Sequence, residues 1–295
     1  MENLQLLFTN HTFIIVSIGT SLLGFISGIL GSFIVLKKQS LLGDGIAHTT
    51  LPGVILSFLI TKSKNLEILL LGALISAFLG YMLINFITKN SKVKFDSALA
   101  IVLSVFFGFA MVLLTISQKT ENANQIGLDT YIYGQASAML IRDVEILIIS
   151  VFFLLVVLNI FWKEFKLITF DEEFAKVLGY KTDKLNMILN FLVIISIVIG
   201  LQSVGVILIS ALLICPSVSA RQWTNSLEKM VLLSGIFGMV SSLIGTIISS
   251  SQLGFPTGAC IVIIASLICF FSILFAPNRG IIHKIYNKMS QNKGV

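Results

Sequence analysis

Nine runs of apolar residues, each about 20 residues long, most constrain what this chain can fold into. They lie near residues 12–36, 43–61, 66–88, 97–117, 142–162, 185–201, 204–220, 230–250 and 256–275. A helix needs about 20 mostly apolar residues to cross about 30 Å of hydrocarbon. The runs therefore predict an all-α integral membrane protein, a polytopic bundle of about 8–9 transmembrane helices. The sixth and seventh runs meet at "GLQSVG", where a tight turn or a broken helix would change the count.

Composition supports a membrane protein with one structural domain. Charged residues make up 12% of the chain, against roughly 25% in ordinary soluble domains, and mean hydropathy is +0.99. No internal repeat, low-complexity linker or long polar segment divides the sequence. Residues 1–295 are therefore predicted to form a single transmembrane domain, with small residues at every fourth position of several helices allowing close packing.

The basic residues predict the orientation, because short loops rich in lysine and arginine stay in the cytoplasm. Nine crossings with the N-terminus outside place 16 of the 20 basic residues in the cytoplasm, together with the C-terminus. Lys62, Lys64, Lys119 and Arg142 remain outside. The net charge of +6 is thus explained by topology. No basic block is interleaved with aromatic residues, so membrane lipid is an expected partner and nucleic acid is not.

Asp44 and His48 stand at the start of the second apolar run, four residues apart, so a helix places both on one face. Ionisable groups inside a bilayer usually face a cavity or a partner and serve function. An oxygen and an imidazole nitrogen suit a first-row divalent ion, but two ligands are too few, and a second copy of the subunit would complete the set. The alternative is that Asp44 only caps a helix starting at Gly45, with His48 packed nearby.

The remaining candidates for metal or catalytic chemistry are weak. His11 and His283 have no carboxylate at helical spacing. The three cysteines lie inside apolar runs without the paired spacing of a zinc site, and are predicted to be small buried hydrophobic residues. The chain has no H-E-x-x-H motif and no phosphate-binding G-x-x-x-x-G-K-[ST] loop. A metalloenzyme is therefore not favoured, and any ATP chemistry must come from another polypeptide.

Residues 163–184 form the longest predicted cytoplasmic connection and contain a short helix signal. Asp171 can cap the helix, Glu172 suits its positive end and Gly179 suits its C-terminal stop. One face carries apolar side chains at i, i+3 and i+4: Phe174, Val177 and Leu178. That face can be buried either by the lipid interface or by another protein, and the spacing alone does not separate the two.

Five segments, in order, resemble the permease subunits of manganese, zinc and iron importers of the ATP-binding-cassette superfamily. They are "LLGDGIAHTTLPG" (41–53), "YGQAS" (133–137), "FDEEFAKVLG" (170–179), "GVILISALLICPSVSA" (205–220) and "FPTGACIVIIASLICFFSILFAPNRG" (255–280). The resemblance covers nearly the whole chain. "YGQAS" and "FAPNRG" are more similar to the manganese and iron branch than to the zinc branch.

The resemblance implies a fold similar to that of cobalamin and siderophore importer permeases, in a multi-pass protein of the bacterial cell (inner or plasma) membrane. The chain would pair with a second permease copy or paralogue, with cytoplasmic ATPase subunits and with an extracytoplasmic metal-binding protein. It would be a transport subunit rather than an enzyme, binding no permanent cofactor and carrying a divalent ion, manganese first and zinc or iron as alternatives, by alternating access.

The same resemblance assigns roles to particular residues. Asp44 and His48 match the metal-site residues of the family. Residues 171–179 match its coupling helix, which favours a protein partner for the apolar face. The coupling residues would be Asp171, Glu172, Phe174, Val177, Leu178 and Gly179.

An ion-gradient-driven secondary metal transporter is the alternative function. Such a protein needs its own coupling groups, typically several acidic residues within helices, and inverted repeats. The sequence shows one clear intramembrane carboxylate and no repeat. Co-purification with an ATPase would separate the two functions.

Overall fold

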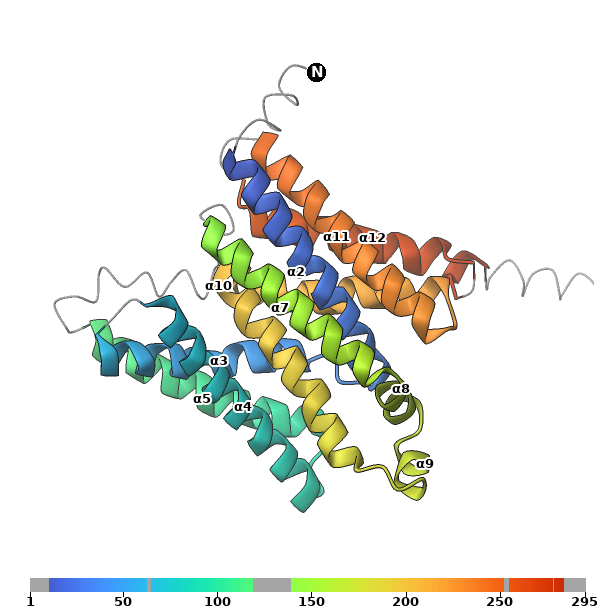
Figure 1. Cartoon of the computed structure of the whole chain (residues 1–295), viewed down its shortest axis with the longest axis horizontal. Helices are drawn as coiled ribbons and strands as arrows, with labels where there is room; N and C mark the ends of the chain where they lie inside the picture. Colours follow the sequence, from blue (N-terminus) through green and yellow to red (C-terminus); the bar gives the residue numbers. More distant parts are fainter. Residues whose placement is uncertain (1–10, 63–64, 119–138, 252–254, 278, 284–295) are drawn as a thin grey trace, which may run out of the picture. The chain divides into compact units, whose positions relative to one another are not determined.

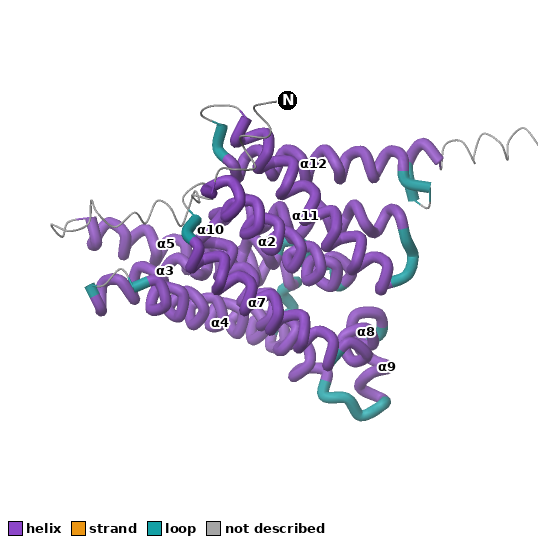
Figure 2. Tube along the Cα trace, turned by 45° about the horizontal axis from the view of Figure 1, so that its top comes forward, coloured by secondary structure: helices purple, strands orange, loops and turns teal. Residues whose placement is uncertain are grey.

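The computed structural model describes residues 11–62, 65–118, 139–251, 255–277 and 279–283. Throughout these ranges the chain is helical between short connections, and no strand occurs among the described residues (Figures 1 and 2). The described part contains nine helical stretches long and apolar enough to cross a membrane. The predicted all-α membrane class and the number of spans are therefore confirmed.

Eight long helices and two short ones make up the described chain. Their bounds are α2 (His11–Leu36), α3 (Leu42–Thr61), α4 (Leu66–Asn90), α5 (Phe95–Gln118), α7 (Ile141–Ile160), α8 (Trp162–Phe170), α9 (Glu172–Val177), α10 (Thr182–Trp223), α11 (Leu227–Ser251) and α12 (Thr257–Phe275). Local signals fit these ends: the Asn65 side chain accepts a hydrogen bond from the Glu67 N–H at 3.2 Å and so caps α4.

Helix α10 contains two of the nine spans, Thr182–Leu201 and Val204–Trp223. Gly205 interrupts it with a non-helical backbone, φ 79° and ψ 171°. A positive φ of this kind is readily adopted only by glycine, since a Cβ would clash with the backbone. The predicted break at "GLQSVG" is therefore a broken helix.

By its internal contacts the chain divides into two compact units. Unit 1 consists of Met1–Lys38, Ala136–Tyr180 and Ala211–Val295, and unit 2 of Gln39–Gln135 and Lys181–Ser210. The prediction of a single transmembrane domain is not tested by this division and stays a prediction.

Unit 1 is built on the contact between α2 and α11, which run side by side in both views (Figures 1 and 2). Glycine lets the two backbones touch: a Cβ on Gly24 would lie 2.4 Å from the Gly238 carbonyl oxygen. A polar side chain reinforces the contact, because the Ser234 hydroxyl of α11 donates to the Gly28 carbonyl oxygen at 2.6 Å. The Ser217 hydroxyl of α10 donates to the same oxygen at 3.0 Å. Close packing of this kind replaces the hydrophobic drive that lipid cannot supply.

Unit 2 is organised around α3, which packs against α4 and α5. A Cβ on Gly53 would lie 2.1 Å from the Gly72 carbonyl oxygen, so α3 and α4 also meet at backbone contact. The Ser76 hydroxyl donates to the Thr49 carbonyl oxygen at 2.6 Å across the same interface. These contacts hold α3, the helix that carries both predicted metal ligands, in a defined position within unit 2.

Candidate metal-binding site

Asp44 lies in the first turn of α3 rather than at its cap. The helix begins at Leu42 after Leu41, which makes no side-chain capping bond. The alternative that Asp44 caps a helix starting at Gly45 is therefore wrong, because the helix has already begun two residues before Asp44. A carboxylate in the first turn still benefits from the positive end of the helix.

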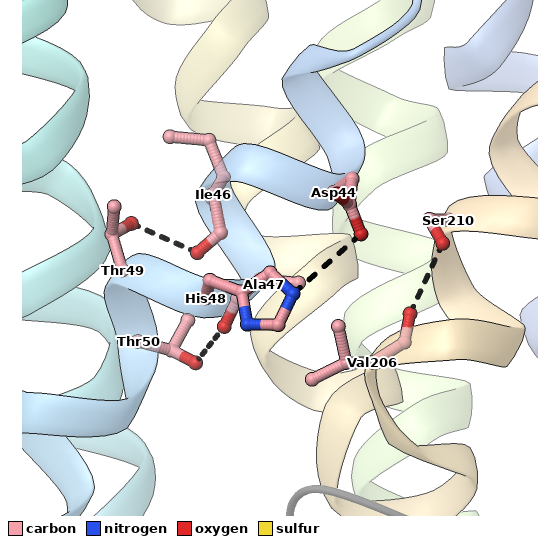
Figure 3. Close-up of polar contacts among 8 residues, drawn as sticks. All are labelled: Asp44, Ile46, Ala47, His48, Thr49, Thr50, Val206 and Ser210. Carbon is pink, nitrogen blue, oxygen red and sulfur yellow. Dashed lines mark hydrogen bonds and ion pairs between the residues drawn. The ribbon is translucent and has the colours of Figure 1, made fainter. Parts of the chain in front are cut away.

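The side chains of Asp44 and His48 point toward one another from successive turns of α3 (Figure 3). His48 Nε2 and Asp44 Oδ1 are 3.8 Å apart, too far for a hydrogen bond. Two ligand atoms that each lie about 2.1 Å from one ion are about 3.0–4.2 Å apart, depending on the angle between them. The gap is compatible with two atoms that share a metal ion, and the metal site itself stays a prediction.

Both side chains remain partly open, since Asp44 is 47% and His48 26% exposed. Among the described residues no group of three or more histidines, cysteines and acidic residues is arranged to hold a metal ion. The pair therefore supplies two ligands on an accessible helix face, and a complete shell requires donors from outside this set.

Phe107 of α5 orients the His48 ring, a contact that the sequence did not predict. The two rings meet edge to face, with centroids 5.4 Å apart and planes at 85°. His48 Nδ1 is buried and has no hydrogen-bond partner among the described residues. The edge-to-face contact with Phe107 therefore constrains the orientation of the His48 ring.

The threonine hydroxyls next to the pair are used within the helix. The Thr49 hydroxyl donates to the Ile46 carbonyl oxygen at 2.8 Å, and the Thr50 hydroxyl donates to the Ala47 carbonyl oxygen at 2.5 Å (Figure 3). Pro52 lacks the N–H that would otherwise bond to the His48 carbonyl oxygen one turn earlier. Asp44 and His48 are thus the side chains of this stretch best placed to meet an ion.

An apolar groove of about 390 Å³ follows on the same stripe of α3, at Pro52, Leu56 and Ile60. Its other walls come from α4 and α5. Ser57 and Ser76 contribute the only side-chain oxygens of its lining. The groove offers apolar walls rather than metal ligands.

The other two histidines belong to unit 1, whereas Asp44 and His48 belong to unit 2. His11 is the first residue of α2, and His283 lies in the final described segment; both are exposed. Of the motif segments, "YGQAS" lies outside the described residues, as does residue 278 within "FAPNRG".

The short helix predicted at residues 171–179 is present as α9. The Asp171 carboxylate accepts the Phe174 N–H at 2.9 Å, and Gly179 adopts a φ of +86° directly after the helix. Both end signals are therefore confirmed. Its apolar face is open: Phe174 is 51%, Val177 83% and Leu178 54% exposed.

Helix α8 connects α9 to the end of α2 through aromatic contacts. Phe33 meets Trp162 and Phe165 edge to face, with centroids 6.0 and 6.4 Å apart. Lys37 follows the end of α2, where burial lowers the pKa of its amine and the negative charge of Glu172 partly opposes that shift. Sequence periodicity pointed to neither contact, because both join separate helices.

The sequence of this chain is similar to those of known membrane proteins. Residues 10–276 match the family described as the ABC 3 transport family. The chain is 42% identical over 288 residues to the zinc transport system membrane protein TroC of Treponema pallidum (strain Nichols), covering 98% of this chain and 97% of that protein. It is 46% identical over 271 residues to the manganese transport system membrane protein MntC of Bacillus subtilis (strain 168), covering 92% of this chain and 62% of that longer protein.

A solved structure is similar over nearly the same range. PsaBC from Streptococcus pneumoniae, in complex with Fab, matches with a TM-score of 0.82 and 30% sequence identity. The match covers 94% of this chain and 96% of that chain.

Proposed function

Because the chain belongs to the ABC 3 transport family, we propose that it is the membrane permease subunit of an ATP-driven importer that moves a divalent transition metal ion into the cytoplasm. The observation that carries this proposal is the pair of Asp44 and His48, which face one another on α3 at a separation suited to a shared ion. The pair lies near the start of a helix long and apolar enough to span a bilayer.

The proposed cargo is manganese, with zinc and iron as alternatives. A carboxylate oxygen and an imidazole nitrogen suit any of these ions, and the Irving–Williams order favours zinc over manganese at equal geometry. One relative is named for zinc and another for manganese, at 42% and 46% identity, so similarity does not separate them. The ion is a substrate, and no permanent cofactor forms part of the proposal.

A transport site must release its ion as well as bind it. Two ligands on a partly exposed helix face bind weakly alone and more tightly when a second permease copy or paralogue supplies a second pair. Separation of the two halves would then weaken the site. Alternating access follows if binding and release occur in two arrangements of the halves.

The energy for that movement would come from cytoplasmic ATPase subunits docked on α9. The three exposed apolar side chains of this helix, together with its capped and therefore well-defined ends, suit a protein partner. The ion would be delivered by an extracytoplasmic metal-binding protein. In the orientation predicted from the basic residues, the protein lies in a bacterial cell membrane with its N-terminus outside. The C-terminus and α9 are then cytoplasmic.

The test separates the metal site from the ATPase contact. The full chain, with its ATPase and binding protein, is reconstituted into liposomes and offered Mn²⁺, Zn²⁺ and Fe²⁺ separately. Changing an outer-shell metal partner costs about 10- to 100-fold in affinity or activity, so loss of a direct ligand in Asp44→Ala should reduce uptake at least as much. Val177→Asp should instead reduce co-purification of the ATPase, because it places a charge in the apolar contact.

Asp96→Ala is the matched control for Asp44→Ala, since Asp96 also lies in the first turn of its helix and is exposed. It should transport normally, and Asp44→Ala should keep the ATPase bound. Uptake that persists in Asp44→Ala would place the metal site elsewhere. Uptake without any ATPase would instead support the secondary transporter.

A further inference from the structure

Helices α8 and α9 are joined through a single residue, Asp171. Its backbone N–H donates to the Leu167 carbonyl oxygen at 2.9 Å at the end of α8, and its carboxylate accepts the Phe174 N–H at 2.9 Å and caps α9. The Asp171 carbonyl oxygen also accepts the Ala175 N–H at 3.2 Å. Because this joint is hydrogen-bonded to both helices, α8 and α9 have little freedom to move independently.

The connection from α9 to α10 is longer and less constrained. Residues 178–181 separate the two helices, and Gly179 among them has a φ of +86°. The N–H groups of Gly179 and Tyr180 donate back to carbonyl oxygens of α9, as in a helix C-cap. The boundary between the two compact units falls directly after Tyr180, so α9 is grouped with unit 1.

Buried aromatic contacts attach α8 to α2 within unit 1. Phe33 of α2 and Phe165 of α8 are both 0% exposed, and their ring centroids are 6.4 Å apart. Phe33 also meets Trp162, the first residue of α8, at 6.0 Å. Because close-packed buried side chains transmit displacement, a movement of α8 reaches the end of α2.

An ion pair attaches α8 to α11. Lys166 Nζ lies 2.8 Å from Glu228 Oε1, and Glu228 stands in the first turn of α11. Helices α2 and α11 in turn meet at backbone contact, where a Cβ on Gly24 would lie 2.4 Å from the Gly238 carbonyl oxygen. Helix α8 is therefore attached to both members of a closely packed helix pair.

We propose that α8 passes the movement that the ATPase imposes on α9 to the packed pair of α2 and α11. Asp171 is the joint in this route, and the Lys166–Glu228 ion pair positions α8 against α11. Coupling between distant sites is carried by contiguous packed elements, which here are α9, α8 and the pair of α2 and α11. The inference rests on the proposed transport function and specifies how its energy reaches the membrane helices. The competing route leads from α9 directly along the chain into α10.

The test measures metal ions taken up per ATP hydrolysed by the reconstituted complex of full chain, ATPase and binding protein. The ion is whichever of Mn²⁺, Zn²⁺ and Fe²⁺ the unmodified complex takes up most. Two glycines inserted between Phe170 and Asp171 make the joint flexible, but leave the apolar face of α9 and its capping residue in place. The variant should still co-purify with the ATPase and hydrolyse ATP, while uptake per ATP should fall to the level of Asp44→Ala.

The matched control places the same two glycines between Tyr180 and Lys181, in the other connection of α9. Uptake per ATP should stay at the level of the unmodified complex, because the route through α8 is intact. Normal uptake per ATP with the first insertion would overturn the proposal. An equal or larger loss with the control insertion would also overturn it, because the connection to α10 would then be required.

Charge reversal tests the same route without changing the chain length, and it decides the proposal if the first insertion variant does not assemble. Lys166→Glu should lower uptake per ATP, and adding Glu228→Lys should restore it by forming the pair with reversed charges. Partly exposed ion pairs contribute little to stability, so the melting temperature should hardly change. The control is Lys89→Glu, since Lys89 pairs with Asp183 at 2.6 Å within unit 2. No rescue by Glu228→Lys, or an equal loss in Lys89→Glu, would contradict the role of the pair.

The unmodified complex distinguishes failure of this inference from failure of the proposed function. If the unmodified complex takes up no metal, or takes it up without ATP, the proposed function and the inference are both overturned. If it takes up metal with ATP and the first insertion leaves uptake per ATP unchanged, only the inference is overturned.

Discussion

At the scale of single residues, the candidate site stands out because the apolar helices carry few polar side chains. Asp44 and His48 share one face because they are four residues apart, which is a property of any α-helix. The direction of the imidazole, however, depends on Phe107 from another helix. The ligand types were thus readable from the sequence, and the orientation of one of them was not.

Lys37 provides a test of residue-scale electrostatics by pH. Burial lowers the pKa of its amine below 10.5, so between the folded pKa and 10.5 the unfolded chain binds more protons. Stability should therefore rise with pH through that window. Lys37→Met removes the charge, so its advantage in melting temperature over the unmodified protein should be largest near neutral pH and should shrink as the pH approaches 10.5.

Thermal unfolding of the purified protein at a series of pH values measures this effect. Lys38→Met is the control, because Lys38 is adjacent in sequence and exposed. The same pH dependence in both variants would argue against burial of Lys37 as the cause.

At the scale of helices, packing depends on the absence of side chains as much as on their presence. A Cβ on Gly238 would lie 2.1 Å from the Gly24 carbonyl oxygen, whereas a Cβ on Gly108 would have nothing within 4 Å. Both glycines are inside long helices, so propensity alone treats them alike. Only the contact between α2 and α11 makes Gly238 necessary.

We therefore expect Gly238→Val to separate α2 from α11 and to destabilise unit 1. Overpacking typically costs about 1–3 kcal/mol, and here backbone rather than a flexible side chain must move, so the upper end of that range is expected. The yield of monodisperse protein and the melting temperature in detergent should both fall. Gly108→Val should change neither, and an equal effect of the two substitutions would exclude close backbone packing as the reason.

At the scale of the whole molecule, the proposed orientation depends on an odd number of crossings. Nine candidate spans are present among the described residues, and two of them are separated only by the break at Gly205. If both halves of α10 cross the bilayer, the termini lie on opposite sides. The distribution of lysine and arginine then favours a cytoplasmic C-terminus.

Protease protection of terminal epitope tags tests this orientation. In intact spheroplasts an N-terminal tag should be cleaved by added protease and a C-terminal tag should be protected until the membrane is opened. Termini on the same side would mean that the two halves of α10 do not both cross. Such a result would change the topology without affecting the Asp44 and His48 pair.

The sequence by itself determined the membrane class, the nine spans, the ends of α9 and the shared face of Asp44 and His48. Each of these depends on neighbouring residues alone: hydrocarbon thickness sets the length of an apolar run, and capping and helical period act within a few residues. The local stretch "GLQSVG" also predicted either a tight turn or a broken helix, and the break at Gly205 is the second of these.

Only the tertiary structure decided that Phe107 meets His48 and that Gly238 touches Gly24. In a soluble helix the apolar stripe marks the buried face. In a membrane helix the face that meets lipid is as apolar as the face that meets another helix, so periodicity cannot show which faces come together. Contacts between distant segments therefore follow from helix packing, which no local pattern in this sequence encodes.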